Sequence, residues 1–370
     1  MKTAKAAVFT GVEKPFDIRE YPVDRAPAGM AGIRMIASGV CGTDIHFHRG
    51  RIPLEPPKII GHELVGRVED LAEEDGRPYG LKVGDHVIVD IASPCGECLL
   101  CHSGDEANCL HMGVTNGGDP EQPPHLWGGY AEYNYSPVGN LIRIPASLDP
   151  TLVCVYACAG PTALHAFALA ERANCGLEKA QVAVVQGLGP VGTFAVAYLA
   201  SLGIPHVAAV TAGNNPAREA LARDLGATDV LNLDASGEEE VIRRIRRLSG
   251  DIGADLVFEA SGSPKAIPVG MRMLRNRGVY LVPGQYSNSG EIAIQPQLIT
   301  FSALQILGSS QYSVADVETY LRFIGANPRL HPIIRSLIAA YPLEQVDRAF
   351  EDAKAGKNVK TILIPSGAEE

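Results

Sequence analysis

The chain has two regions in which hydrophobic and polar residues follow different patterns. Up to about residue 155, apolar and polar residues alternate in short runs such as "DHVIVDIA" (85–92) and "GHELVGRVED" (61–70), between segments rich in Gly and Pro. A period of two is typical of half-buried β-strands. We therefore expect a β-rich domain of short strands and long loops here.

From about residue 181, short apolar runs alternate with helical patterns. "QVAVVQ" (181–186), "HVAAVTA" (206–212) and "ADLVFEAS" (254–261) each precede a helical segment. This alternation predicts right-handed βαβ units and a doubly wound parallel sheet, so the fold class is α/β. The end of the chain adds two helical stretches (314–324 and 343–355) and the strand "KTILIP" (360–365), which we expect to return to the first domain.

One apolar stretch, residues 150–170, contains no Asp, Glu, Lys or Arg. A membrane span is one interpretation. We favour a buried helix broken at Gly160-Pro161, because the stretch also contains His165 and stands alone. The N-terminus does not resemble a signal peptide, so we expect a cytoplasmic protein without a membrane partner.

Composition narrows the possible partners. The chain has 370 residues, enough for two domains, and its net charge is −10, from 32 Lys and Arg against 42 Asp and Glu. The basic run "RRIRR" (243–247) is balanced by Glu238, Glu239 and Glu240. Nucleic acid is therefore excluded as the main partner, because it requires clustered positive charge.

Four of the eight cysteines lie in "CGECLLCHSGDEANC" (95–109). They are Cys95, Cys98, Cys101 and Cys109, spaced C-x2-C-x2-C-x7-C. In a reducing compartment such clusters usually bind metal, and four thiolates that converge tetrahedrally form a structural Zn²⁺ site. An iron–sulfur cluster and disulfides are the alternatives.

A second group of metal-binding side chains lies in "VCGTDIH" (40–46) and "GHE" (61–63). A catalytic zinc has three protein ligands and one open position. Cys41 and His62 can supply two ligands. Cys158, in "ACAGPTALH", is the best third, with Cys154 as its rival.

The glycine-rich turn after "QVAVVQ" has the G-x-G-x-x-G pattern between a strand and a helix, which is the context that a dinucleotide fingerprint requires. Its residues are Gly187, Leu188, Gly189, Pro190, Val191 and Gly192. The glycines permit a tight turn, close approach of a pyrophosphate, and close packing of helix on strand. The helix N-terminus attracts the phosphates.

The second strand should end near Gly213, where an acidic residue usually binds the ribose 2′-hydroxyl. No carboxylate occurs from Ala208 to Arg218. This absence favours NADP, with Asn214 and Asn215 as hydrogen-bond donors and Arg218 as the partner of the 2′-phosphate. NAD, bound with less discrimination, is the alternative.

Taken in order, these motifs resemble those of the zinc-dependent medium-chain alcohol dehydrogenases, over nearly the whole chain. The resemblance implies a GroES-like catalytic domain (1–159 and 312–370) and a Rossmann domain (160–311). It implies two Zn²⁺ per chain, one held by Cys41, His62 and Cys158. It also implies a small-molecule alcohol or carbonyl substrate and a homodimer or homotetramer.

The resemblance further assigns roles around the catalytic zinc. Asp44 would orient His62, and Glu63 would be an outer group or a transient ligand. Thr43 would take the alcohol proton and pass it toward His46, and Thr162 would touch the nicotinamide.

The third ligand position bears on the substrate. The polyol-oxidising branch of the family often has Glu at this position, so Cys158 favours simple, secondary or cyclic alcohols. The alternatives are a polyol or sugar dehydrogenase, a zinc-independent reductase of the same fold, and a non-enzymatic NADP(H)-binding protein. No role is predicted for His48 or for the loop 115–129.

Overall fold

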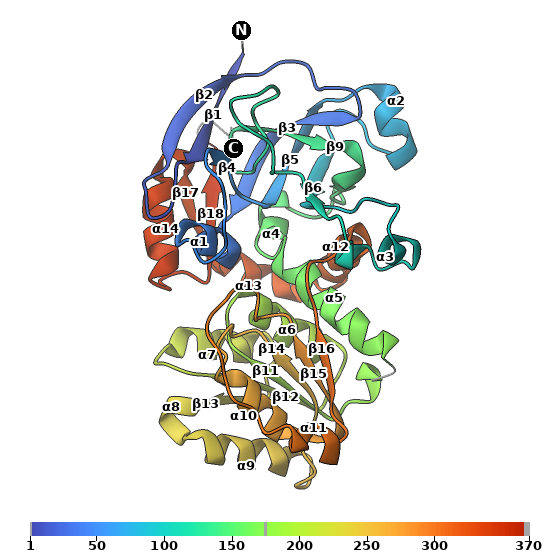
Figure 1. Ribbon diagram of the computed structural model, residues 1–370, viewed down its shortest axis with the longest axis vertical. Coiled ribbons are helices and arrows are strands. Elements are labelled where there is room, and N and C mark those ends of the chain that lie inside the picture. Colours follow the sequence, from blue (N-terminus) through green and yellow to red (C-terminus); the bar gives the residue numbers. More distant parts are fainter. Residues whose placement is uncertain (1, 174–175, 366–370) are drawn as a thin grey trace. The chain divides into compact units, whose positions relative to one another are not determined.

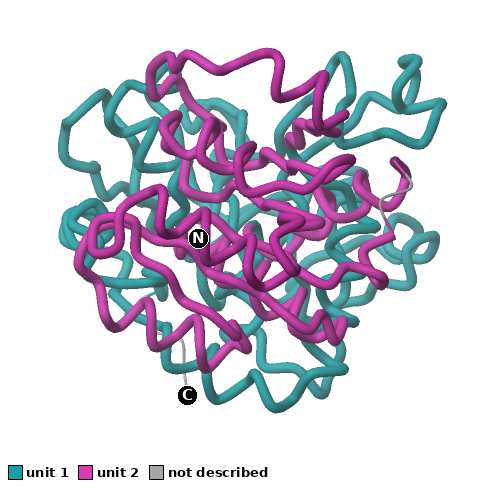
Figure 2. The backbone as a smooth tube through the Cα atoms, turned by 90° about the horizontal axis from the view of Figure 1, so that it is seen from below, with its two compact units in different colours: residues 1–158, 311–370 teal, residues 159–310 magenta. Residues whose placement is uncertain are grey.

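The computed structural model (Figure 1) describes residues 2–173 and 176–365. The chain divides into two compact units, residues 1–158 with 311–370 and residues 159–310, coloured separately in Figure 2. Both ends of the chain thus belong to the first unit, and the second unit is one continuous segment.

The first unit is built mainly on two sheets. The smaller has the order β2-β1-β4, and the larger has the order β10-β6-β5-β3-β18-β17, with β9 also paired to β3. The strands are β1 (Thr3–Phe9), β2 (Asp17–Pro22), β3 (Met30–Gly39), β4 (Lys58–Ile59), β5 (Glu63–Asp70), β6 (His86–Val89), β9 (Tyr133–Pro137), β10 (Leu141–Arg143), β17 (Ile338–Pro342) and β18 (Lys360–Ile364). Because β18 pairs antiparallel with β3, the C-terminal strand completes a sheet that the N-terminal strands began.

Short helices and an aromatic cluster complete this unit. Phe16 packs against Tyr130 and Phe350 with ring centroids 6.3 and 4.8 Å apart. Its helices are α1 (Gly42–His48), α2 (Glu73–Gly76), α3 (Leu99–His102), α4 (Pro150–Cys154), α12 (Val314–Ala326), α13 (His331–Ser336) and α14 (Val346–Lys354). The short strands β7 (Ala92–Ser93) and β8 (Gly113–Val114) pair at the base of the lobe that carries α3.

The second unit is a single six-stranded parallel sheet in the order β13-β12-β11-β14-β15-β16. This arrangement, with helices on both faces (Figure 1), confirms the predicted fold class. The strands are β11 (Val182–Gln186), β12 (His206–Thr211), β13 (Asp229–Asn232), β14 (Ala254–Glu259), β15 (Leu274–Val282) and β16 (Gln305–Gly308). The helices are α5 (Ala159–Arg172), α6 (Pro190–Ser201), α7 (Pro216–Asp224), α8 (Leu233–Ser236), α9 (Glu238–Leu248), α10 (Ala266–Met273) and α11 (Gln297–Phe301).

Alternating side chains of the central strands fill two separate cores. Val182 and Val184 of β11 pack with Val241 of α9 and with α10 on one face. On the other face, Phe167 of α5 lies 4.9 Å from the ring of Phe258 in β14. Strands with apolar residues on both faces are what a covered parallel sheet requires.

The apolar stretch 150–170 does form helix, but the predicted break point is wrong. The chain leaves the helix after Cys154 and enters α5 at Ala159, so Gly160 and Pro161 lie in the first turn of α5. Proline is tolerated there because the N–H groups of a first turn have no partner within the helix. Within the described residues, no helix is both long enough and apolar enough to cross a membrane.

Candidate functional site

Cys41, His62 and Cys158 come together in the first unit, with one ligand atom of each within 4.8 Å of the others. Cys41 precedes α1 as its N-cap, His62 precedes β5, and Cys158 follows α4. Three different elements therefore present two thiols and an imidazole to one point. In the described part of the chain, this is one of two groups with this property.

Asp44 connects two of these three side chains. Its Oδ2 accepts a hydrogen bond from the Cys41 N–H (2.9 Å), which also closes the capping box of α1. Its Oδ1 lies 3.3 Å from Nδ1 of His62. A carboxylate behind a histidine fixes the tautomer and leaves the other ring nitrogen for a metal.

The protonation of this cluster is strongly shifted. The hydrogen bond with Cys158 holds the pKa of the Cys41 thiol well below its ordinary value. Burial opposes the charged form of His62, but Asp44 and Cys41 outweigh burial and hold the pKa of His62 well above its ordinary value. The cluster therefore favours the thiolate form of Cys41, which is the form in which a cysteine binds a metal.

Cys154 does not join the cluster. It is buried in α4, and its Sγ donates a hydrogen bond to the carbonyl oxygen of Glu63 (3.2 Å). Burial raises the pKa of Cys154 to about 12. The geometry thus separates the two cysteines that the sequence left as rivals.

Glu63 is paired with a residue that the sequence analysis missed. Its Oε2 forms an ion pair with Nζ of Lys360, and both side chains are 1% exposed. Burial raises the pKa of Glu63 to about 7 even though Lys360 opposes this shift. The only hint of this ion pair in the sequence is the lysine at the start of the apolar run "KTILIP", and nothing in the sequence indicates which acidic residue is its partner.

Thr43 and His46 both lie on α1. The Thr43 hydroxyl is 3.8 Å from Sγ of Cys41. Burial, followed by the positive charge of Arg51, holds the pKa of His46 below its ordinary value. A neutral imidazole near neutral pH is suited to accept and release a proton.

His48, two residues further along α1, is anchored elsewhere. Its Nε2 donates to the carbonyl oxygen of Lys14 (3.0 Å), and its Nδ1 lies 2.9 Å from Nζ of Lys354. The ring also packs against Phe350 at 5.5 Å. These contacts fix the C-terminal end of α1, which explains a histidine for which no role was predicted.

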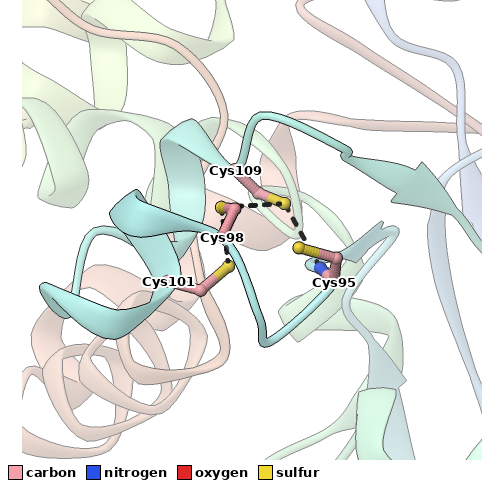
Figure 3. Close-up of side chains that lie close together, drawn as sticks. All are labelled: Cys95, Cys98, Cys101 and Cys109. Atoms are coloured by element: carbon pink, nitrogen blue, oxygen red, sulfur yellow. Dashed lines mark hydrogen bonds between the residues drawn. The ribbon is translucent and has the colours of Figure 1, made fainter.

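The four-cysteine lobe forms the second group, as Figure 3 shows. Sγ of Cys98 is 3.5 Å from that of Cys101 and 3.9 Å from that of Cys109. These separations exclude disulfides, whose sulfurs are about 2.05 Å apart, and every cysteine of the described residues is free. Backbone N–H groups, first that of Cys101, lower the pKa of Cys98 to about 6, which favours the thiolate that a metal requires.

The glycine-rich turn of the second unit leads from β11 into α6. Gly187 has φ +90°, and a Cβ there would come within 2.6 Å of the backbone of Ser261. A Cβ on Gly192 would overlap the carbonyl oxygen of Gly187, whereas the space beside Gly189 is open. Leu188 is buried, and Pro190 and Val191 are half-buried. The open side of the turn thus lies at the N-terminus of α6, and the N-terminus of a helix attracts phosphate groups.

The loop after β12 differs from the prediction in one respect. The Gly213 N–H donates to Oδ2 of Asp234 (2.7 Å), so a carboxylate from α8 does reach this loop. Counting along 208–218 could not reveal it, because Asp234 lies 21 residues further on. Asn215 caps α7 through the N–H of Arg218 (3.1 Å), so its side-chain oxygen is already engaged.

Arg218 and Thr162 are the two other residues predicted to bind the cofactor. Arg218 is half-buried in the first turn of α7, and within the described residues no carboxylate pairs with its guanidinium. Thr162 lies in α5 and is half-buried.

Two family models match the chain. One, described as an alcohol dehydrogenase GroES-like domain, matches residues 27–146, and the other, described as a zinc-binding dehydrogenase, matches residues 190–326. The chain is 30% identical to a 5-exo-hydroxycamphor dehydrogenase of Pseudomonas putida, over 98% of this chain and 99% of that protein. It is also 30% identical to an alcohol dehydrogenase of Geobacillus stearothermophilus, over 97% and 98% of the two chains.

Solved structures show the same likeness. The crystal structure of an alcohol dehydrogenase from Thermotoga maritima superposes with a TM-score of 0.89 at 27% identity. The superposition covers 99% of this chain and all of that one.

Proposed function

Because the chain belongs to the zinc-dependent medium-chain alcohol dehydrogenase family, we propose that it interconverts a secondary or cyclic alcohol and its ketone, with NADP as the hydride carrier. The observation that carries this proposal is the convergence of Cys41, His62 and Cys158 in front of Asp44. A binding protein without catalysis would not need a three-ligand site of this kind.

The donor set fits zinc. Two thiols and one imidazole are a known catalytic combination, and three protein ligands leave one position of a tetrahedron for substrate. A bound Zn²⁺ would supply a Lewis acid that lowers the pKa of an alcohol, and the nicotinamide would supply the hydride acceptor. Cys95, Cys98, Cys101 and Cys109 would hold a second, structural zinc, because four thiolates leave no open position.

Proton movement is assigned to α1. Thr43 lies next to Cys41 and would accept the proton of the alcohol through its hydroxyl. His46, one helical turn further on, would pass that proton to solvent, and its lowered pKa favours the neutral form that can receive it. Asp44 would keep His62 oriented, and Glu63 would remain bound to Lys360 behind the cluster.

The cofactor choice rests on the loop after β12. Gly213 and Asn214 leave space where a carboxylate would otherwise stand, and Arg218 has a guanidinium without an acidic partner in the described residues. Asp234 acts against this preference, because its carboxylate would repel a 2′-phosphate. We therefore propose a moderate preference for NADP over NAD, with Thr162 contacting the nicotinamide.

Two observations support the proposed substrate class. Cys158, rather than a glutamate, is the third side chain of the cluster. The relative in Pseudomonas putida is named for hydroxycamphor, a cyclic secondary alcohol. Both favour an alcohol with few hydroxyl groups over a polyol.

The proposal extends to compartment and assembly. Free cysteines in both clusters suit the reducing cytoplasm. Strand β16 is the last strand of its sheet, and Ile306 on it and Phe301 just before it are 40% and 80% exposed. An exposed apolar edge strand favours pairing with a second copy, so we propose a homo-oligomer.

The test is nicotinamide reduction, followed by absorbance, on primary, secondary, cyclic and polyol substrates with NADP and NAD in parallel. Cys158→Ser should lose one of two zinc ions and at least a thousandfold in kcat/KM, a roughly 4 kcal/mol loss of transition-state stabilisation. Cys154→Ser, four residues away and outside the cluster, should keep both properties. Full activity in Cys158→Ser, or wild-type protein without zinc and without turnover, would overturn the proposal.

A further inference from the structure

Tyr130 is connected to the metal-binding cluster through Asp44. The hydroxyl of Tyr130 donates a hydrogen bond of 2.7 Å to Oδ2 of Asp44. Both side chains are completely buried. The same Oδ2 accepts the Cys41 N–H, and Oδ1 of the same carboxylate faces Nδ1 of His62. A single carboxylate thus joins Tyr130 to two of the three proposed zinc ligands.

The Tyr130 ring is fixed where it stands. Its backbone N–H donates to the carbonyl oxygen of Ile60 (3.0 Å), and its carbonyl oxygen accepts from Ala7 (2.8 Å). Gly61 has φ +96°, and a Cβ there would come within 2.5 Å of the ring. Phe350 closes another side, with its ring perpendicular to that of Tyr130 at 5.9 Å. The glycine immediately before His62 therefore makes the space that the tyrosine occupies.

Each carboxylate oxygen of Asp44 has its own partners, and both sets of contacts are kept only in one orientation of the carboxylate. If the carboxylate rotated, Oδ1 would leave Nδ1 of His62, and no other donor reaches Oδ1 among the described residues. If the backbone N–H of Cys41 were the only donor to Oδ2, the carboxylate could turn about that single hydrogen bond. The Tyr130 hydroxyl donates a second hydrogen bond to the same oxygen from another direction, and the two bonds together define the plane of the carboxylate.

We propose that Tyr130 is a positioning residue for the catalytic zinc, which acts by holding Asp44 so that His62 presents Nε2 to the metal. This inference rests on the proposed function, since it requires that Cys41, His62 and Cys158 bind zinc. Removal of the hydroxyl leaves the carboxylate free to turn, so that Nδ1 of His62 loses a fixed acceptor. Outer groups of this kind change metal affinity by about 10–100-fold when mutated, and Tyr130 is one step further out, so we expect about tenfold.

The experiment measures zinc release from the holoenzyme to a chromogenic chelator, for wild type, Tyr130→Phe and Tyr135→Phe. Tyr135 is the matched control, because it is also fully buried and its hydroxyl also makes one hydrogen bond, to the carbonyl oxygen of Asp24 (2.6 Å). Cys158→Ser identifies which phase of release belongs to the catalytic cluster. Tyr130→Phe should release zinc about tenfold faster in that phase only, and Tyr135→Phe should match wild type.

Two results would overturn the inference. One is release from Tyr130→Phe at the wild-type rate; the other is equal acceleration by Tyr130→Phe and Tyr135→Phe, which would mean that any lost buried hydroxyl has the same effect. If wild type and Cys158→Ser instead released zinc in the same phases, no zinc would be assigned to the catalytic cluster, and the proposed function would be overturned. The failure of the inference and the failure of its premise are thus separate observations.

Discussion

Replacement of Lys360 by methionine tests the ion pair with Glu63. The Lys360 side chain is 1% exposed, and so is that of Glu63. Lys360→Met keeps most of the side-chain volume and removes the charge, so a buried carboxylate loses its only cationic side-chain partner among the described residues. An unpaired buried charge is strongly destabilising, whereas the intact pair contributes little net stability.

The magnitude follows from this burial. Loss of one partner of a buried pair costs about 3–5 kcal/mol, a large part of the roughly 5–15 kcal/mol by which domains are stable. For a unit of this size each kcal/mol lowers Tm by about 2–4 °C, so we expect Tm to fall by roughly 6–20 °C. The assay is thermal and urea unfolding of the zinc-loaded protein, monitored by circular dichroism.

Two further variants make the result interpretable. Lys357→Met removes an ammonium from the exposed pair with Asp352, only three residues before Lys360, and should cost less than about 1 kcal/mol. Lys360→Met combined with Glu63→Leu replaces the whole pair by apolar side chains and should recover most of the loss. A loss below about 1 kcal/mol for Lys360→Met, or a double variant no more stable than that single one, would refute the reasoning.

Three other predictions concern the pH dependence of stability, the cofactor and the structural zinc. Burial raises the pKa of Asp90 to about 7, against about 3.8 when unfolded, so the folded state loses stability as pH rises from 4 to 7. Asp90→Asn should therefore gain about 2–3 kcal/mol more over wild type at pH 8 than at pH 5 in urea unfolding, and parallel pH curves would contradict this. Arg218→Ala should lower kcat/KM for NADP at least tenfold and leave NAD unchanged, and Asp234→Asn should raise the preference for NADP; equal effects on both cofactors would contradict the assignment. Cys101→Ser should leave one zinc per chain by metal analysis and lower Tm, and an unchanged zinc content would exclude the lobe as a metal site.

Local signals explain why the parallel sheet was predictable. The central strands, such as β11, are short apolar runs, and the turns that follow β11, β12 and β14 carry Gly187, Gly213 and Gly262. Strand β17 was missed because "IAAYP" (338–342) has no polar position, so no alternation of apolar and polar residues marks it as a half-buried strand. The break before α5 was misplaced because a Gly-Pro pair stops a helix only in its interior, and Gly160-Pro161 stands in a first turn.

The candidate site likewise contains residues that local sequence signals predict and residues that they do not. The two clusters of cysteine and histidine could be predicted because metal chemistry restricts both residue type and spacing, and the structure brings the members of each cluster together. Asp234, Tyr130 and Lys360 were not found, since each acts on a residue far away in sequence and none belongs to a motif. Their roles depend on which chain segments the fold brings together, and no local pattern encodes that.

The charges around the cluster show why such distant residues are needed. If zinc binds as proposed, the thiolates of Cys41 and Cys158 and the carboxylates of Asp44 and Glu63 would be four negative groups close together, two of them fully buried. A zinc ion would compensate two of these charges, and the Lys360 ammonium would compensate a third. Hydrogen bonds must stabilise the remaining one, and Asp44 is the carboxylate that accepts them, from Cys41 N–H and from Tyr130. On this proposal, the three ligands alone would not make a stable site, and the distant lysine and tyrosine would be needed to keep these acidic groups close together.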